Sequence, residues 1–223
     1  MTSTISRIEC RDRPELWFPD RARSDWNMSD RQLAFIEKTA KEAPLPRFLE
    51  IGVYHGVTTT LLAQIGIVVA VDWFEGNPEY ASEERESTAE DLKDRLEGFL
   101  ANLRLQGIRR KITTIVGRSE DALPALSAGQ FGLVLVDADH SEAAAQFDME
   151  QAWRLLVPGG WLMLDDFSHA IVRGVDSNPV ERAFVRFCLK YRAGDLSGET
   201  ADELPPKLVR IRKPVEQMLN ETD

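Results

Sequence analysis

The chain has 223 residues, of which 43% are hydrophobic, so it can bury one sizeable core but is short for two ordinary domains. With 27 basic and 37 acidic side chains, its formal net charge of −10 repels the phosphates of nucleic acids and anionic lipids. Because the basic residues are interleaved with acids and form no long stripe, we expect neither a nucleic acid nor a membrane as a partner.

The two cysteines, Cys10 and Cys188, form no CxxC motif and no metal-ligand spacing. We therefore expect reduced thiols rather than a disulfide framework or a zinc site. The first residues, Met1 to Arg13, are polar and charged, and no run reaches the ~18 apolar residues of a membrane span. The default expectation is a cytoplasmic protein.

Residues 1–40 are expected to form an arm that covers the core, ahead of one domain at residues 41–223. Ser29 can cap a helix that carries Leu33 and Ile36 on one face. Large aromatic residues more often pack a terminal arm onto the core than line a pocket. This expectation applies to Trp17, Phe18 and Trp26.

Short apolar runs rich in β-branched residues then alternate with longer helical patterns, which is typical of βαβ units and a parallel sheet. Strands that are covered on both faces should have this composition. The runs are Arg47 to Ile51, Val68 to Val71, Ile112 to Val116, Gly132 to Val136 and Trp161 to Leu164. We therefore predict an α/β fold with a Rossmann-like, doubly wound, mostly parallel sheet in three α/β/α layers, preceded by an N-terminal helical arm.

The segments between these strands carry helical patterns. Residues Asp91 to Leu105 place five apolar side chains on one stripe, which predicts an amphipathic crossover helix. Ser141 can cap a helix that runs to Leu156, before Pro158-Gly159-Gly160 ends it and leads into the next strand. The remaining assignments are a loop at the acidic segment Glu75 to Glu90, a helix at Val180 to Tyr191 and a final edge strand at Lys207 to Arg212.

A candidate cofactor site follows the first predicted strand, in the sequence Glu50-Ile51-Gly52-Val53-Tyr54-His55-Gly56. Glycines at such a corner let the backbone approach a ligand, and the N-terminus of the next helix, which begins near Thr58, offers free N–H groups to an anion. Asp72 closes the second strand, where it can accept hydrogen bonds from ribose hydroxyls. Ser119, after the third strand, lies where an adenine would cross the sheet edge. These features alone do not separate S-adenosylmethionine from NAD.

Each of these features also has a purely structural interpretation. Gly52 and Gly56 can serve a tight turn, Asp72 can cap a helix, and Ser119 can cap the helix after it. The combination is more specific than its parts.

The order of the motifs resembles that of class I S-adenosylmethionine-dependent methyltransferases, over roughly Phe48 to Phe167. Besides the glycine motif, the resemblance rests on Asp72, Gly117-Arg118-Ser119, Val136-Asp137-Ala138-Asp139-His140 and Pro158-Gly159-Gly160. Tyr54 stands where the commonest motif has its middle glycine, a replacement that is frequent in the metal-dependent subgroup. The resemblance implies cofactor contacts from Glu50, Gly52, Tyr54, Gly56, Thr58, Asp72, Ser119 and Asp137.

Two neighbouring strands carry acidic residues at their carboxyl ends: Asp137 and Asp139 with His140 after one, and Asp165-Asp166 after the other. In a parallel sheet these ends open onto the same crevice as the cofactor. Gathered carboxylates repel one another unless a cation or protons offset their charge, and oxygen ligands favour magnesium, calcium or manganese. Alternatively, Asp139 caps the helix and Asp165-Asp166 is a solvated turn.

The pattern Asp137-x-x-His140 with Asp165-Asp166 resembles the magnesium-dependent sugar O-methyltransferases of macrolide pathways, such as the macrocin and mycinamicin enzymes, and the cephalosporin hydroxylase-like proteins. The resemblance implies that Asp137, Asp165 and Asp166 hold Mg²⁺ and that His140 is the general base, with His169 as the reserve candidate. Catechol-type enzymes carry Asp-Asn in place of the acidic pair, so a catechol substrate is less expected.

The sequence therefore predicts an S-adenosylmethionine-dependent, Mg²⁺-assisted O-methyltransferase that acts on a small-molecule hydroxyl, in a sugar or a natural-product diol. Three other functions are compatible with parts of the pattern. The same fold can bind S-adenosylmethionine and perform hydroxylase-like chemistry, it can be a non-catalytic binding module, or it can be an NAD-dependent oxidoreductase, which leaves the acidic residues unexplained. The sequence does not decide between a monomer and a homo-oligomer.

Overall fold

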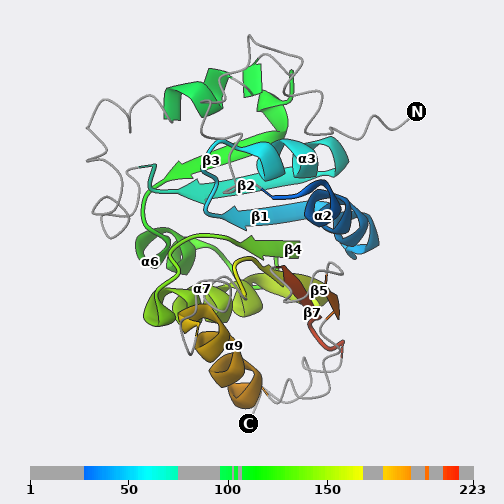
Figure 1. Cartoon of the computed structure of the whole chain (residues 1–223). Coiled ribbons are helices and arrows are strands. Elements are labelled where there is room, and N and C mark those ends of the chain that lie inside the picture. Colours follow the sequence, from blue (N-terminus) through cyan, green and yellow to red (C-terminus); the bar gives the residue numbers. More distant parts are fainter. Residues whose placement is uncertain are drawn as a thin grey trace.

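A computed structural model of the chain describes residues 28–74, 96–101, 103–104, 107–167, 178–191, 199–200 and 208–215. The predictions for Trp17, Phe18, Trp26, the Glu75 to Glu90 segment and His169 lie outside the described residues. The described part forms a seven-stranded sheet with the strand order β3-β2-β1-β4-β5-β7-β6 (Figure 1). Its parallel strands are β1 (Arg47–Ile51), β2 (Ile67–Asp72), β3 (Ile112–Val116), β4 (Phe131–Val136) and β5 (Leu156–Leu164).

Two antiparallel strands complete the sheet. Strand β7 (Val209–Arg212) pairs with β5, and β6 (Glu199–Thr200) pairs with β7. The predicted strand at Lys207 to Arg212 is confirmed at Val209–Arg212, but it is not the edge strand, because β6 pairs with β7 on its outer side. The two residues of β6 are too few to produce a recognisable strand pattern.

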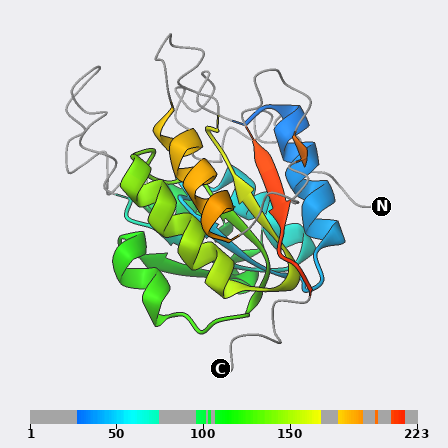
Figure 2. The same cartoon turned by 90° about the horizontal axis from the view of Figure 1, so that it is seen from below.

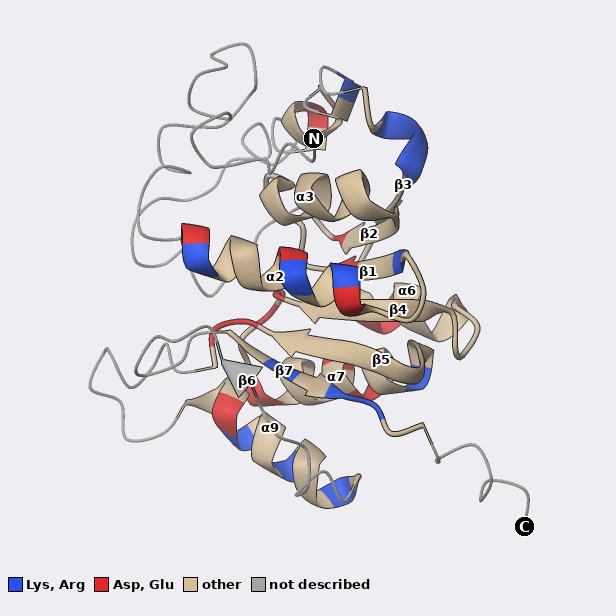
Figure 3. Cartoon of the chain, turned by 90° about the vertical axis from the view of Figure 1, so that its right-hand side faces the viewer, with Lys and Arg blue, Asp and Glu red and all other residues tan. Residues whose placement is uncertain are grey.

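Helices cover both faces of the sheet, which confirms the predicted three-layer α/β/α architecture. Figure 3 shows α2 (Asp30–Glu42) and α3 (Val57–Ile65) on one side of the sheet, and α7 (Glu142–Leu155) and α9 (Pro179–Lys190) on the other. Figure 2 shows α7 and α9 side by side. The short helix α6 (Ser119–Ala122) and the 3-10 turns Arg109–Lys111 and Leu123–Ala125 lie between the main elements.

Alternate side chains of the central strands point to these two helical layers. In β1, Leu49 and Ile51 belong to the core cluster that includes α7 and α9, whereas Phe48 belongs to the cluster that includes α2 and α3. Residues 96–101 are helical, and Phe99 and Leu103 are fully buried in the second cluster, as the predicted crossover helix requires. Strands that are buried on both faces explain the nearly continuous apolar runs of the sequence.

Three helices begin at side chains that cap them. Ser29 and Gln32 form a reciprocal capping box at α2, Ser141 accepts from the backbone N–H of Ala144 at α7, and Asn178 accepts from Val180 at α9. The first two caps confirm the predicted helix starts. Among the described helices, none combines the length and the hydrophobicity needed to cross a bilayer.

The end of α7 differs from the prediction. The helix ends at Leu155, and Pro158-Gly159-Gly160 lies inside β5 rather than in the turn before it. The register between β4 and β5 shifts in this region, from the pair Phe131 and Leu156 to the pair Leu133 and Trp161. A proline and a glycine with φ +77° suit such an irregular strand segment, which the sequence pattern cannot distinguish from a turn.

Candidate active site at the carboxyl ends of the strands

The glycine turn after β1 is held against the end of β4. Gly52 has φ +85°, and a Cβ at this position would overlap the backbone carbonyl of Asp137. Gly56 has φ +78°, and a Cβ there would overlap the ring of Phe99. Both positions therefore require glycine because of the protein's own packing, in addition to any approach of a ligand. Tyr54, in the place of the usual middle glycine, also has a positive φ, of 51°.

Asp72 holds this turn from the end of β2. Its Oδ2 accepts from the backbone N–H groups of Val53, at 2.6 Å, and Tyr54, at 2.8 Å, and its Oδ1 accepts from Phe74. Hydrogen bonds between backbone N–H groups and a carboxylate are of the strong, charge-assisted kind. The carboxylate thus fixes the turn rather than capping a helix, and it lies at the predicted strand end beside the turn.

Glu50 lies beneath the turn and is fully buried. Its carboxyl oxygens accept from the hydroxyls of Thr58 and Thr59 in the first turn of α3. Burial raises the pKa of Glu50 to about 8, although the two threonines lower it. The predicted direct contacts of Glu50 and Thr58 with a cofactor stay predictions, since both side chains are engaged with each other.

Helix α3 begins at Val57, and its N-cap residue, Gly56, offers no side chain to cap it. The first backbone N–H groups of the helix therefore meet no capping side chain and suit an anionic group. His55, next to Gly56, is buried with its ring centroid 3.7 Å from that of Tyr54, in agreement with a structural role.

The third strand contributes Ser119, which is half-buried at the start of α6. The N-cap of α6 is Arg118, so the interpretation of Ser119 as the cap is wrong. The guanidinium of Arg118 lies 4.2 Å from the ring centroid of Trp73, which joins the ends of β3 and β2. Behind Ser119, burial raises the pKa of Asp148 to about 7, while the Ser119 hydroxyl lowers it.

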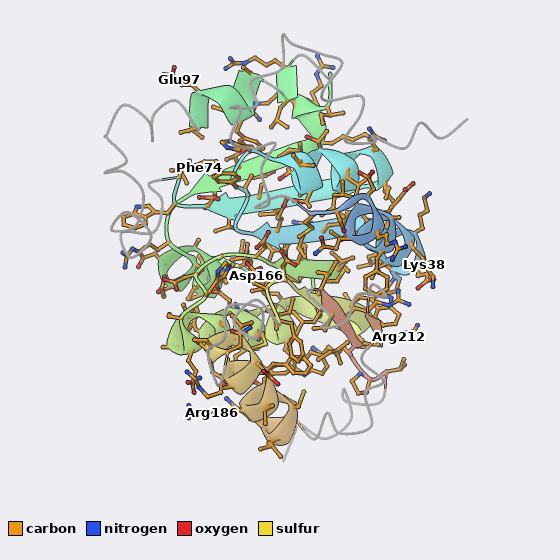
Figure 4. The ribbon with its side chains drawn as sticks, viewed as in Figure 1. Lys38, Phe74, Glu97, Asp166, Arg186 and Arg212 are labelled. Carbon is orange, nitrogen blue, oxygen red and sulfur yellow. The ribbon has the colours of Figure 1, made fainter. Side chains whose placement is uncertain are left out.

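The acidic residues after β4 and β5 form a cluster with a histidine. One ligand atom each of Asp137, His140 and Asp166 lies within 4.8 Å of the other two. His140 Nε2 is 2.9 Å from Asp166 Oδ2, with 28% and 10% of the two side chains exposed. Figure 4 shows Asp166 on the side of the molecule to which the parallel strands point. Asp139 accepts from the backbone N–H of Ser141 ahead of α7, which supports its structural interpretation.

The predicted metal ligands are only partly brought together. The cluster contains the predicted ligands Asp137 and Asp166 and the predicted base His140, but it does not contain the predicted ligand Asp165. Asp165 is 4% exposed, and its Oδ1 accepts from the side-chain amide of Gln32 in α2 at 3.3 Å. Burial lowers the pKa of His140, but the hydrogen bond and charge of Asp166, with the charges of Asp165 and Asp139, raise it above its usual value.

Asp166 has an unusual backbone conformation, with φ 55°. The side-chain amide of Asn178 donates to the backbone carbonyls of Asp166, at 2.8 Å, and Phe167, at 2.7 Å. A non-glycine residue in this region is strained and persists where its surroundings hold it, often at functional sites. Neither Asn178 nor Gln32 was identified from the sequence, because each looks only like a helix-capping residue there.

A divalent cation fits this group of residues. The carboxylates of Asp137 and Asp166, which offer oxygen atoms within 4.8 Å of each other, are suitable ligands for a hard cation, and the His140 imidazole lies in the same group. The cluster adjoins the glycine turn, since the backbone N–H of Asp137 donates to Ile51 and its carbonyl contacts Gly52. The cation and cofactor sites would therefore be direct neighbours.

The described geometry agrees with comparisons to known proteins. A family model described as a methyltransferase domain matches residues 49–167. A catechol O-methyltransferase of Mycobacterium tuberculosis is 29% identical over 151 residues, which are 66% of this chain and 58% of that protein. The chain thus spans 58% of the length of this curated relative.

Two solved structures show the same fold. The O-methyltransferase NovP has a TM-score of 0.65 and 17% identity, with 83% of this chain and 81% of that chain covered. The O-methyltransferase TomG of Streptomyces achromogenes, in complex with S-adenosylmethionine, has a TM-score of 0.60 and 20% identity, with 85% and 82% covered.

Proposed function

Because the chain belongs to the methyltransferase domain family, we propose that it is an S-adenosylmethionine-dependent O-methyltransferase that acts on a small-molecule hydroxyl with the help of a divalent cation such as Mg²⁺. One observation supports the proposal above the others. The glycine turn held by Asp72 and the cluster of Asp137, His140 and Asp166 meet at the same sheet edge, where Gly52 contacts Asp137. A methyl donor and an activated hydroxyl must meet in the same way.

The first site is suited to the cofactor. The uncapped N-terminus of α3 would bind the methionine carboxylate, Asp72 would accept from the ribose hydroxyls, and Ser119 lies where the adenine would rest. The bound cofactor supplies a methyl group that its sulfonium already activates. The protein's own tasks are then to orient the acceptor in line with that methyl group and to remove the acceptor proton.

The second site is suited to these tasks. Asp137 and Asp166 of the cluster would hold the cation, with Asp165 as a third ligand that lies outside the cluster in this structure. The cation would lower the pKa of a hydroxyl held beside it. His140 Nε2 now lies 2.9 Å from Asp166 Oδ2. Once Asp166 binds the cation instead, this nitrogen would take the proton of the acceptor hydroxyl. The oxygen would form its bond to the methyl carbon as the carbon–sulfur bond breaks, which would give a methyl ether, S-adenosylhomocysteine and a protonated His140.

The acceptor is best described as a compound with two adjacent oxygens. Two such oxygens would bind one cation together and hold the reacting hydroxyl in place. The relative from Mycobacterium tuberculosis is named for catechol, which has this arrangement, but Asp165-Asp166 differs from the Asp-Asn pair of catechol-type enzymes. A sugar or natural-product diol is therefore our first choice.

The second candidate is a protein of this fold that binds the cofactor and performs other chemistry. Methyl transfer from labelled S-adenosylmethionine to a panel of sugar diols, polyketide glycosides and catechols, each with Mg²⁺ and with a chelator, separates the two. We expect transfer to a non-catechol diol that a chelator abolishes. Tight binding of S-adenosylhomocysteine without transfer to any diol would favour the second candidate.

A further inference from the structure

Gln32 of α2 reaches the proposed cation site from outside the segment that matches the family model. We infer that Gln32 is a positioning residue, which fixes the carboxylate of Asp165 next to the cluster of Asp137, His140 and Asp166, where Asp165 would complete the ligands of the cation. The inference rests on the proposed cation site and adds a residue to it.

Both ends of the Gln32 amide are engaged. Nε2 donates to Asp165 Oδ1 at 3.3 Å, and Oε1 accepts from the backbone N–H of Ser29 at 2.7 Å. The bond to Ser29 decides which way round the amide lies, so the donor end must face Asp165. Gln32 is 2% exposed and Asp165 is 4% exposed, so little water competes for this contact.

The helix that carries Gln32 is fixed at both ends. At its start, the Ser29 hydroxyl accepts from the backbone N–H of Gln32 in the capping box. Near its end, the buried guanidinium of Arg210 in β7 donates to Thr39 and Glu42, at 3.0 and 2.7 Å. Arg210 also lies 4.2 Å from the ring centroid of Trp161. Gln32 is therefore held in place by the body of the fold.

A neutral amide is the appropriate partner for a carboxylate that must bind a cation. An arginine or lysine at this place would fix Asp165 as well, but its charge would repel the cation. The amide restricts the carboxylate by one hydrogen bond and leaves its negative charge intact. Hydrogen-bond partners of metal-binding side chains commonly act in this way.

The test compares Gln32→Met with Ser29→Ala in the full chain. Each substitution removes one half of the capping box, so both should lower the thermal stability to a similar degree. Only Gln32→Met removes the donor to Asp165. We expect it to weaken Mn²⁺ binding, measured by electron paramagnetic resonance with S-adenosylhomocysteine bound, roughly 10- to 100-fold, and Ser29→Ala to leave that affinity unchanged.

Gln32→Asn is a second variant, which keeps an amide side chain that is one methylene too short to reach Asp165. The same loss of Mn²⁺ affinity is expected for it. Unchanged Mn²⁺ affinity in both Gln32 variants would overturn the inference while the cation site stands. A wild-type chain that binds no Mn²⁺ would overturn the proposed cation site itself, and this inference with it.

Discussion

The carboxylates at the two ends of the site have different kinds of partner. At the β1–β2 end, Glu50 accepts from Thr58 and Thr59, and Asp72 accepts from three backbone N–H groups. At the β4–β5 end, Asp137 and Asp166 gather with each other and with His140. The first arrangement satisfies each acid with a neutral donor, whereas the second concentrates negative charge.

In the proposed function, this difference would separate cofactor binding from catalysis. Acids with neutral donors make a rigid turn that is complete before a ligand arrives, because hydrogen bonds to backbone N–H groups keep a carboxylate in place. Gathered acids repel one another and gain from a cation or from protons, so their end of the site is complete only with an added positive charge. The following predictions test whether the two ends are as separate as this account requires.

The largest effect is expected at Gly52, where the end of β1 touches the end of β4. Gly52→Ala places a Cβ on the backbone carbonyl of Asp137 at a positive φ, so the β1 and β4 ends must move apart. We expect the variant to lose both S-adenosylhomocysteine and Mn²⁺ binding and to be destabilised by several kcal/mol in urea unfolding.

Gly117→Ala is the matched control for that change. It makes the same substitution at the end of β3, where a Cβ would meet no atom within 4 Å. Its stability should stay within about 0.5 kcal/mol of wild type. If Gly52→Ala behaves like Gly117→Ala, the two ends do not meet at Gly52 as described.

Two single substitutions should each affect only one end of the site. Asp166→Ala removes a carboxylate from the cluster and should abolish metal-stimulated turnover while leaving the affinity for S-adenosylhomocysteine nearly unchanged. Asp72→Ala removes the acceptor of the glycine turn and should weaken that affinity about 10- to 100-fold, since hydrogen bonds to a charged group contribute about 1.5–3 kcal/mol. Turnover assays with Mg²⁺ and with a chelator measure the first effect, and titration calorimetry with S-adenosylhomocysteine measures the second. Equal losses of S-adenosylhomocysteine affinity in the two variants would contradict the separation.

His140→Ala tests the base. Turnover should fall roughly 100-fold or more, the usual contribution of a positioned base, while the cation is still bound. His169→Ala, at the reserve candidate, should be mild. Single-turnover rates and metal content are the measurements. Loss of the cation from the His140 variant would instead make His140 a ligand, as its place in the cluster also allows.

The last prediction concerns the pH dependence of stability at Glu50, and not ligand binding or turnover. Its pKa is about 8 in the folded chain against 4.5 for an ordinary glutamate, so the unfolded chain loses this proton first as the pH rises. The stabilising contribution of the neutral carboxyl is therefore present below pH 4.5 and is lost as the pH rises toward about 8. Glu50→Gln, which is neutral throughout, should gain stability relative to wild type over that window, by up to roughly 1.4 kcal/mol per pH unit. A difference in the free energy of unfolding between the variant and wild type that stays constant at all pH values would refute the raised pKa.

Much of the architecture could be predicted from the sequence because local patterns determine it. Arg47–Ile51 and Ile112–Val116 are strands with the predicted bounds, and the caps at Ser29 and Ser141 start their helices where expected. Each of these features depends on residues within one turn or one strand of one another.

What could not be predicted depends on contacts between distant segments. The amide of Gln32 meets Asp165 across 133 residues of sequence, and no local pattern indicates such a pairing. The cluster contains His140 but not Asp165, and this depends on the directions of side chains that follow two different strands. The irregular start of β5 follows from its pairing with β4, which only the sheet defines.

The central claim is that the β1–β2 end binds S-adenosylmethionine on its own and that the β4–β5 end adds a cation for chemistry. The most direct test is the thermal stability of the chain with S-adenosylhomocysteine or NAD, each with Mg²⁺ or with a chelator. A ligand of the native state raises the melting temperature by mass action. We predict that S-adenosylhomocysteine raises it in the presence of Mg²⁺ and of the chelator, and that NAD does not. Stabilisation by NAD, or no stabilisation by S-adenosylhomocysteine under either condition, would contradict the account.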